Sequence, residues 1–327
     1  MIVITGGAGF IGSGIVWGLN NRGFDDIIIV DRLQRDERWK NLTNLKFADY
    51  IDKDTFIEDI KNDNLNLPIE GIIHLGACSD TLERDADFLM QNNFEYTKRL
   101  AKWSVKKGVR FVYASSAATY GDGSAGFSDE HERLHLLRPL NMYAYSKHIF
   151  DLWALRNGLL DDIAGLKYFN VFGPNEYHKS EMKSIILKSY EQIKESGSIK
   201  LFRSHKKKFK DGMQMRDFIY IKDTVDMTLF IYDNHNANGI YNVGTGKART
   251  FYDLAVNVFT ALGKKINIEF IEMPNDIRNR YQYFTQADLS KLNNIGYHKN
   301  IMQFEDAVSE YIRDYILSDD KYLGKKD

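Results

Sequence analysis

The strongest fold signal in the chain is ITGGAGFIGSG, residues 4–14. Its glycines lie between the apolar, mostly β-branched stretch MIVI and a segment whose apolar residues recur at helical spacing. Gly7, Gly9 and Gly12 fit the pattern G-x-G-x-x-G, and Gly6, Gly9 and Gly12 fit the wider pattern G-x-x-G-x-x-G. Glycines in such a turn let the backbone approach a pyrophosphate, and the following helix N-terminus holds its charge. The order of strand, glycine turn and helix therefore predicts a dinucleotide-binding unit.

A second apolar run, residues 27–30, ends in Asp31, about 20 residues past the glycine turn, where such a unit places an acid for the ribose. A carboxylate accepts hydrogen bonds from a ribose 2′-hydroxyl and repels a 2′-phosphate, so Asp31 alone favours NAD. Guanidinium groups bind phosphate in a fixed fork, so a basic run at this point favours NADP. The basic residues that follow at once are Arg32, Arg35, Arg38 and Lys40.

The composition is that of an ordinary globular protein, with 327 residues, 43% hydrophobic and 27% charged. A net charge of -1 gives no reason to expect nucleic acid or an anionic membrane as partner. The one cysteine, Cys78, excludes an intrachain disulfide framework and a multi-cysteine zinc site, and no metal site is expected. With no signal-like N-terminus and no apolar run of membrane-span length, we expect a soluble cytoplasmic protein.

Strand-like and helical patterns alternate through the first half of the chain. Strands are predicted at residues 27–30, 45–48, 71–77, 110–116 and 164–173, and helices at 88–107 and 143–158. Parallel strands need crossover connections, so this order predicts an α/β fold with a Rossmann-type doubly wound parallel sheet.

The alternation loosens from Pro174 onward, with a strand-like RDFIYI, a turn-like NVGTGKA and a final helix predicted from Met302. We expect a dinucleotide domain at residues 1–172, with returns near 217–243 and 284–297. Residues 173–327 are then mainly a smaller α/β substrate domain.

Tyr143 and Lys147 lie four residues apart, so on a helix they share one face. A free tyrosine has a pKa near ~10, and a neighbouring ammonium favours its phenolate, which could exchange a proton with a substrate hydroxyl. Upstream, a predicted strand ends in Ser115 and Ser116, whose hydroxyls can bind the same substrate oxygen. Ser116 is the better candidate of the two.

Nearly the whole chain resembles the extended short-chain dehydrogenase/reductases, and within them the nucleotide-sugar epimerases that act on C6 of ADP-heptose. The stretches that carry the resemblance are TGGAGFIGS, ADYIDK, GACS, NN at 92–93, YASSAATYG, PLNMYAYSK, KYFNVFGPNEYHK, RDFIYIKD, NVGTG and RYQYFTQADL. SSAATYG and the last stretch favour the heptose enzymes over other members.

The resemblance implies a role for each matching residue. Together with the glycine turn, the expected dinucleotide contacts are Gly6, Gly9, Phe10, Ile11, Gly12, Asp31, Arg32, Arg38, Lys53, Leu75, Gly76, Ala77, Cys78, Ser79, Asn92, Lys147, Val171 and Lys179. The expected nucleotide-sugar contacts are Ser116, Asn170, Glu181, Lys188, Phe202, Arg203, Ser204, His205, Arg216 and Tyr281. Tyr143 and Lys179 would be the two catalytic acid/bases, supported by Lys147 and Ser116.

The chain departs from the family pattern in one stretch. Ser180 and Glu181 stand where glycine and serine are expected, and Lys188 stands where a substrate-binding histidine is expected. Glu181 would repel a pyrophosphate. The segment between Phe202 and Arg216 is also longer than the pattern, and its basic run, residues 205–210, could attract an ADP moiety.

The resemblance implies a reaction as well. ADP-D-glycero-D-manno-heptose would be epimerised to the L-glycero form through a transient C6 ketone, with one hydride taken and returned by bound NADP, and the product would supply heptose for the lipopolysaccharide core. NADP is the predicted cofactor, because the resemblance and the basic run agree, and NAD is the alternative. A closed homo-oligomer, a pentamer, is the implied assembly.

Three other functions fit the same fold. A UDP-hexose 4-epimerase is the nearest. A 4,6-dehydratase would carry an Asp-Glu pair after the serine-bearing strand end, where this chain reads SSAATYG. A non-catalytic dinucleotide-binding regulator often lacks the tyrosine or lysine of the pair, and this chain has both. Fold alone does not separate these functions.

Overall fold

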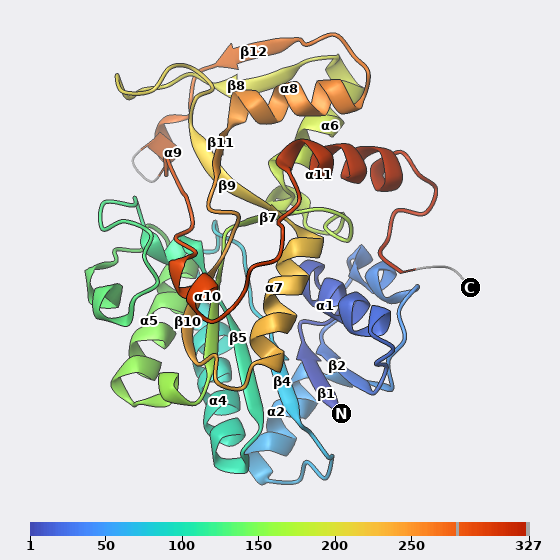
Figure 1. Cartoon of the computed structure of the whole chain (residues 1–327), viewed down its shortest axis with the longest axis vertical. Coiled ribbons are helices and arrows are strands. Elements are labelled where there is room, and N and C mark those ends of the chain that lie inside the picture. Colours follow the sequence, from blue (N-terminus) through green and yellow to red (C-terminus); the bar gives the residue numbers. More distant parts are fainter. Residues whose placement is uncertain (279–280, 325–327) are drawn as a thin grey trace.

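The computed structural model describes residues 1–278 and 281–324 (Figure 1). Its largest element is a seven-stranded parallel sheet in the order β10-β6-β5-β4-β1-β2-β3. The chain builds outward from β1 in one direction and then from β4 in the other, which leaves a crevice at the carboxyl ends of these strands. The predicted doubly wound α/β fold is confirmed. The strands are β1 (Ile2–Thr5), β2 (Ile27–Asp31), β3 (Asp49–Asp52), β4 (Gly71–His74), β5 (Arg110–Ser116), β6 (Ala164–Tyr168) and β10 (Gly239–Val243).

Helices cover both faces of this sheet (Figure 1). Successive side chains of a strand point to opposite faces, so Ile2 and Ile4 of β1 pack in one buried cluster and Val3 packs in the other. The first cluster includes residues of α1 (Phe10–Asn21) and α7 (Ile221–Asp233). The second includes residues of α2 (Lys53–Asn62), α4 (Tyr96–Lys107) and α5 (Met142–Arg156).

The predicted helix at residues 88–107 is present and begins slightly earlier. It consists of α3 (Ala86–Leu89), one wider π-helical turn at Met90–Glu95, and α4. The wide turn carries Asn92 and Asn93. Such turns often lie at functional sites.

Two strand predictions are wrong. The third strand is β3 at Asp49–Asp52 rather than residues 45–48, because β3 is a half-exposed edge strand and lacks the apolar run of a central strand. Residues 164–173 form two strands, because the chain leaves the large sheet at Phe169. Beyond that residue, β7 (Asn170–Phe172) pairs with β9 (Met215–Tyr220).

Most of the remaining elements form a smaller layer above the crevice, whereas α10 (Ser290–Asn294) lies beside β10 of the large sheet (Figure 1). The predicted strand at residues 216–221 is confirmed as β9, which lies between β7 and β11 (Ala248–Thr250). A two-stranded sheet joins β8 (Ile199–Phe202) to β12 (Ile268–Ile271). The last helix starts at Phe304 rather than Met302, because Gln303 is an extended N-cap. The other helices are α6 (Ile185–Ser196), α8 (Phe251–Ala261), α9 (Asn275–Arg278) and α11 (Phe304–Glu310).

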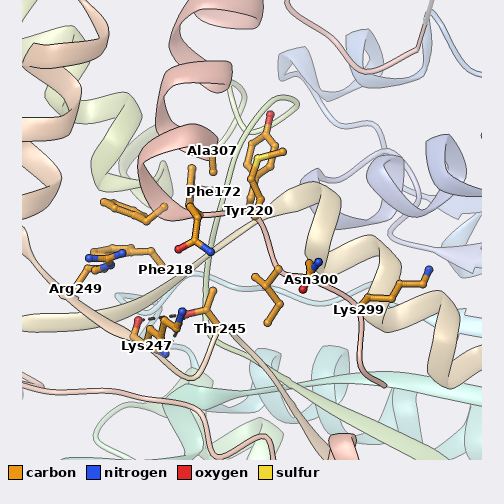
Figure 2. Close-up of a pocket in the computed structure, with 13 residues that line it drawn as sticks. Phe172, Phe218, Tyr220, Thr245, Lys247, Arg249, Lys299, Asn300 and Ala307 are labelled. Carbon is orange, nitrogen blue, oxygen red and sulfur yellow. Dashed lines mark hydrogen bonds between the residues drawn. The ribbon is translucent and has the colours of Figure 1, made fainter. Parts of the chain in front are cut away.

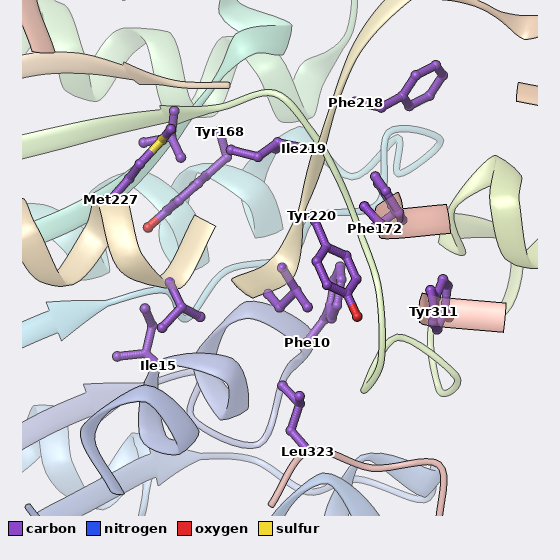
Figure 3. Packing of buried hydrophobic residues seen from close by; sticks show 14 of the residues in the cluster. Phe10, Ile15, Tyr168, Phe172, Phe218, Ile219, Tyr220, Met227, Tyr311 and Leu323 are labelled. Carbon is purple, nitrogen blue, oxygen red and sulfur yellow. The ribbon is translucent and has the colours of Figure 1, made fainter. Parts of the chain in front are cut away.

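The two layers meet in an aromatic cluster. Phe172 of β7, Tyr220 of β9 and Tyr311 belong to the same buried cluster as Phe10, at the start of α1 (Figure 3). The Phe172 ring lies 5.4 Å from that of Tyr220 and 6.4 Å from that of Tyr311. This packing fixes the smaller layer against the glycine turn. Within the described ranges, no helix combines the length and apolar character needed to cross a bilayer.

Candidate active site

A cavity of about 1060 Å³ lies beyond the carboxyl ends of β1, β2, β4 and β5, and the smaller layer closes its other side. Ligand sites of small molecules and cofactors commonly have volumes of about 300–1,000 Å³. Every predicted dinucleotide and catalytic residue lines this cavity. So do five of the ten predicted nucleotide-sugar residues, namely Ser116, Asn170, Phe202, Arg216 and Tyr281.

The glycine turn has no room for side chains. Gly6 has a φ of +68°, and a Cβ there would lie 2.7 Å from the backbone nitrogen of Gly76. A Cβ on Gly12 would lie 2.0 Å from the carbonyl oxygen of Gly6. Gly9 caps α1, and no acidic residue lies in the first turn of this described helix. The turn therefore fits the pyrophosphate of a dinucleotide.

Asp31 ends β2 with both carboxylate oxygens engaged. They accept hydrogen bonds from the backbone N–H groups of Ala8, at 2.9 Å, and Arg32, at 2.7 Å. Burial raises the pKa of Asp31, and these hydrogen bonds and the guanidinium of Arg38, at 3.7 Å, oppose the rise. Asp31 thus organises the glycine turn.

The cations around Asp31 are held by acidic or amide partners. Arg38 donates to Asp36 at 2.6 Å, and Arg32 forms an ion pair with Asp54. Lys53 donates to Asn92 Oδ1 at 2.6 Å, and burial lowers the pKa of Lys53. The three cations, Arg32, Arg38 and Lys53, line the cavity at the edge where the adenosine end of a dinucleotide would lie.

Tyr143 enters the cavity from the first turn of α5, which Asn141 caps by accepting from the N–H of Ala144 at 2.8 Å. Burial raises the pKa of Tyr143, and its hydrogen bond with the Ser116 hydroxyl opposes the rise. The ammonium of Lys147, one turn further along α5, donates to the Ala114 carbonyl at 2.8 Å.

Lys147 is itself strongly affected by its environment. It is 5% exposed, and burial lowers its pKa to about 8, with Asp151 and Cys78 acting in the opposite direction. The ammonium is therefore still protonated in most molecules at neutral pH. Lys147 links α5 to the end of β5, which keeps Tyr143 and Ser116 in register.

Lys179 reaches the cavity from the loop that follows β7. Its ammonium lies 5.3 Å from the centre of the Phe10 ring, at the start of α1. Burial lowers the pKa of Lys179, and Glu176 opposes this. Lys179 therefore lies near the start of α1 and Tyr143 lies on α5, and these two helices cover opposite faces of the large sheet.

Arg216 projects from β9 into the part of the cavity nearest the smaller layer. It is 8% exposed, and its guanidinium lies 5.3 Å from the ring of Tyr281 and 5.7 Å from the ring of Phe251. It donates to the Met215 carbonyl at 2.8 Å, and no carboxylate in the described part of the chain forms an ion pair with it. A buried guanidinium with no acidic partner is suited to an anionic ligand.

Residues 2–244 match the NAD dependent epimerase/dehydratase family. The chain belongs to this family. A nicotinamide cofactor follows from membership, and the glycine turn, the acid at the end of β2 and the surrounding cations agree with it.

Two curated relatives of this family member cover almost all of it. It is 51% identical over 323 residues to the ADP-L-glycero-D-manno-heptose-6-epimerase of Nitratidesulfovibrio vulgaris strain DP4, covering 99% of this chain and 100% of the relative. It is 48% identical over 332 residues to the Fusobacterium nucleatum protein of the same name, again covering 99% and 100%.

Two solved structures of epimerases superpose on this family member. The Helicobacter pylori ADP-L-glycero-D-manno-heptose-6-epimerase has a TM-score of 0.79 at 25% identity, covering 96% of this chain and 95% of that one. The UDP-N-acetylglucosamine 4-epimerase of Methanobrevibacter ruminantium M1 has a TM-score of 0.80 at 25% identity, covering 95% and 96%.

Five predicted sugar-nucleotide residues of this epimerase-family protein do not line the cavity: Glu181, Lys188, Arg203, Ser204 and His205. Glu181 and Lys188 form an ion pair at 3.4 Å, so the two departures from the family pattern neutralise each other away from the cavity.

The basic run, residues 205–210, begins at His205, which is one of these five residues. The ring of His205 accepts or donates a hydrogen bond with Tyr283 at 2.8 Å, and the ammonium of Lys206 lies 4.8 Å from the centre of the Tyr283 ring. The run therefore packs on the smaller layer through Tyr283. Arg280, which opens the motif RYQYFTQADL, lies outside the described residues.

Sequence reasoning missed three residues of this family member's site. His178 lines the cavity beside Arg38, and burial lowers its pKa to about 4. Asn93 bonds both backbone groups of Cys78 at 2.9 Å and the Ser146 hydroxyl at 2.9 Å. Phe251 packs on Arg216. The sequence offered a signal for His178, which precedes Lys179 in a quoted motif, and for Asn93, which follows Asn92 in another. It offered no signal for Phe251.

A second cavity of about 260 Å³ lies on the other side of Phe218 (Figure 2). Arg249 lies over the Phe304 ring in its wall and forms an ion pair with Glu305 at 3.2 Å. Over the described ranges, no three His, Cys, Asp or Glu side chains are placed to hold a metal ion.

Proposed function

We propose that this protein interconverts ADP-D-glycero-D-manno-heptose and ADP-L-glycero-D-manno-heptose at C6 and so supplies heptose for the lipopolysaccharide core. The observation that carries the proposal is the pair Tyr143 and Lys179, which line one cavity, Tyr143 from α5 and Lys179 from the loop beside α1. An enzyme that inverts an alcohol centre can use one proton-transferring group for each side of that centre. The shared name of the relatives at 51% and 48% identity supports the substrate.

The two side chains are prepared for opposite proton transfers. When bound, the dinucleotide supplies reversible hydride transfer at C6. Burial raises the pKa of Tyr143, which keeps its hydroxyl as a proton donor, and lowers the pKa of Lys179, which favours the neutral amine as a proton acceptor. Such divergent shifts support the proposed roles of Tyr143 as acid and Lys179 as base. The Ser116 hydroxyl binds the oxygen on C6 of the substrate while Tyr143 transfers its proton to that oxygen.

We propose NADP as the cofactor, with NAD as the alternative. Arg32, Arg38 and Lys53 line the cavity around Asp31, and His178 lies beside Arg38. Carboxylates pair with the two arginines at this edge, where a 2′-phosphate could take over the interaction.

We also propose the division of labour expected above, with residues 1–172 and the two later returns binding the dinucleotide, and residues 173–327 mainly binding the nucleotide-sugar. The pairing of β10 with β6 in the large sheet supports the return at 217–243. A cytoplasmic location and a pentameric homo-oligomer complete the proposal, and light scattering on the purified protein tests the assembly.

One experiment tests substrate and cofactor together. Denaturing the purified protein and identifying the released small molecules by mass should yield NADP and, where a nucleotide-sugar is retained, an ADP-sugar. Turnover on a panel of ADP-, UDP- and GDP-sugars should favour ADP-heptose. Preference for a UDP-hexose would instead support the 4-epimerase function, which the Methanobrevibacter structure makes the second candidate.

Replacing Arg32 and Arg38 together by alanine should weaken NADP binding by a few kcal/mol and change NAD binding little. Charge-assisted hydrogen bonds contribute roughly 1.5–3 kcal/mol each, and only NADP carries the phosphate they would bind. Titration calorimetry with both dinucleotides measures the effect. Arg22→Ala, an exposed arginine paired with Asp233 at 2.6 Å, is the control. Equal weakening for both dinucleotides would remove the two arginines from phosphate recognition.

Replacing Arg216 by alanine should raise KM for the ADP-sugar strongly and lower kcat less. The guanidinium lies on β9 among aromatic rings, where it would bind the anionic diphosphate in ground and transition state alike. Steady-state kinetics with varied substrate separate the two constants. A loss confined to kcat would show that Arg216 acts in the chemical step instead.

A further inference from the structure

Glu176 is fully buried in the loop that carries Lys179 and joins its two ends. Its Oε1 accepts hydrogen bonds from the N–H of Gly173, at 3.3 Å, and from the hydroxyl of Ser184, at 2.7 Å. Its Oε2 accepts from the N–H of Ser184, the N-cap of α6. Its own carbonyl accepts from the N–H of Lys179 at 3.1 Å. The carboxylate therefore ties the end of β7 to the start of α6 across the loop.

The loop has a backbone that needs such support. Gly173, Asn175 and Ser180 have φ angles of +138°, +77° and +43°, and the last two are not glycine. Asn175 is held by Ser13 of α1, at 2.9 Å, and by the N–H of Leu323, at 2.9 Å. Nearby, the hydroxyl of Tyr177 donates to the Lys321 carbonyl at 2.9 Å. Distant parts of the chain thus converge on these few residues.

The charge of Glu176 acts on one cation. No lysine, arginine or histidine among the described residues forms an ion pair with this carboxylate. Burial raises the pKa of Glu176, and its hydrogen bonds with Ser184 and the field of Lys179, the one cation of the described chain that acts on it, oppose the rise. In return, Glu176 is the group that raises the pKa of Lys179 against its burial. The other titratable groups facing Glu176 are the hydroxyls of Tyr177 and Tyr311, and His178 faces Lys179.

We propose that Glu176 is a positioning residue for Lys179, fixing the loop through its three hydrogen bonds and setting how readily the Lys179 amine takes up and releases a proton. The proposal rests on the proposed acid/base role of Lys179. It explains why the chain buries a carboxylate with no ion-pair partner, since such a group is otherwise costly. The clamp and the charge are separate functions of one side chain, so they can be separated by substitution.

Glu176→Gln removes the charge and leaves an amide that cannot accept all three hydrogen bonds. We expect kcat to fall about tenfold, because buried donors lose their acceptor. Without the carboxylate, the pKa of Lys179 falls further. The limb of the kcat–pH profile that follows Lys179 should therefore move to lower pH by about one unit, whether Lys179 acts as acid or as base.

Glu176→Asp keeps the charge but is one methylene shorter, so it cannot span Gly173 and Ser184 together. We expect a similar loss of kcat with that limb of the profile unmoved. Glu195→Gln, an exposed acid on α6, controls for removal of a charge and should change neither quantity. Far-UV circular dichroism and dinucleotide stoichiometry confirm folding of each variant.

The Lys179→Met background decides the interpretation. Glu176→Gln should cause no further loss of kcat there, since residues that act as one unit are not additive. An unchanged kcat and pH profile in Glu176→Gln, or an equal loss in the Lys179→Met background, would overturn the role of Glu176 alone. Full activity of Lys179→Met would overturn both the proposed base and this inference.

Discussion

Epimerisation is expected to fall by about 10²–10⁴-fold when Tyr143 is replaced by phenylalanine or Lys179 by methionine. Each change removes one proton-transferring group and keeps most of the side-chain volume. If each group serves one face of C6, as proposed, then the loss of either one stops the interconversion. Steady-state epimerisation, followed by separation of the two epimers, measures the loss.

Each variant should retain chemistry on its surviving side. A substrate analogue with an aldehyde at the terminal carbon should still be oxidised or reduced there, and NADP should remain bound. Tyr145→Phe, at an exposed tyrosine of α5, and Lys194→Met, at an exposed lysine of α6, are matched controls. Near-normal epimerisation by Lys179→Met would mean that Tyr143 or a water serves both faces.

Gly12→Ala is expected to abolish dinucleotide binding. The added Cβ would lie 2.0 Å from the Gly6 carbonyl oxygen and 2.9 Å from Cα of Gly7, and both are backbone atoms of the turn itself. The turn must therefore open, which moves the N–H groups that would hold the pyrophosphate. We expect affinity to fall by more than about 10²-fold, since several charge-assisted bonds are lost together.

Gly14→Ala on the same helix is the matched control. Its Cβ would meet side-chain atoms of Ile221 and Val225 at 3.1 Å, and these can shift by a few tenths of an ångström. Dinucleotide fluorescence titration and thermal unfolding separate loss of binding from loss of fold. Equal affinity of the Gly12 and Gly14 variants would show that the turn tolerates a side chain and that the pyrophosphate lies elsewhere.

The sequence predicted those parts of the site whose geometry is local. The glycine turn, Asp31 and the Tyr143–Lys147 spacing each depend on residues close together in the chain. Parallel strands bring their carboxyl ends to one edge, so the pattern also placed these groups in one crevice.

Features that depend on tertiary neighbours were missed. Whether residues 164–173 form one strand or two depends on the partner available beyond Phe169, and β9 comes about 45 residues later in the chain. Glu181 lies in the loop before α6, and Lys188 lies in the first turn of α6. Their ion pair neutralises the charge of Glu181, which from the sequence was expected to repel a pyrophosphate. The residues that flank Glu176 in the sequence likewise gave no indication that its carboxylate is buried.

The hydrogen bond between Asn175 and Leu323 has a consequence for the order in which the chain folds during its synthesis. The two residues are separated by 148 positions, and ribosomes add about 5–20 residues per second, so Leu323 is added roughly 7–30 s after Asn175. The glycine turn and all seven strands of the large sheet are already made by then. Ribosome-bound chains stalled before residue 323 should bind the dinucleotide yet remain susceptible to protease near Lys179. We therefore expect the nascent chain to bind the dinucleotide first and to complete the proposed catalytic centre last.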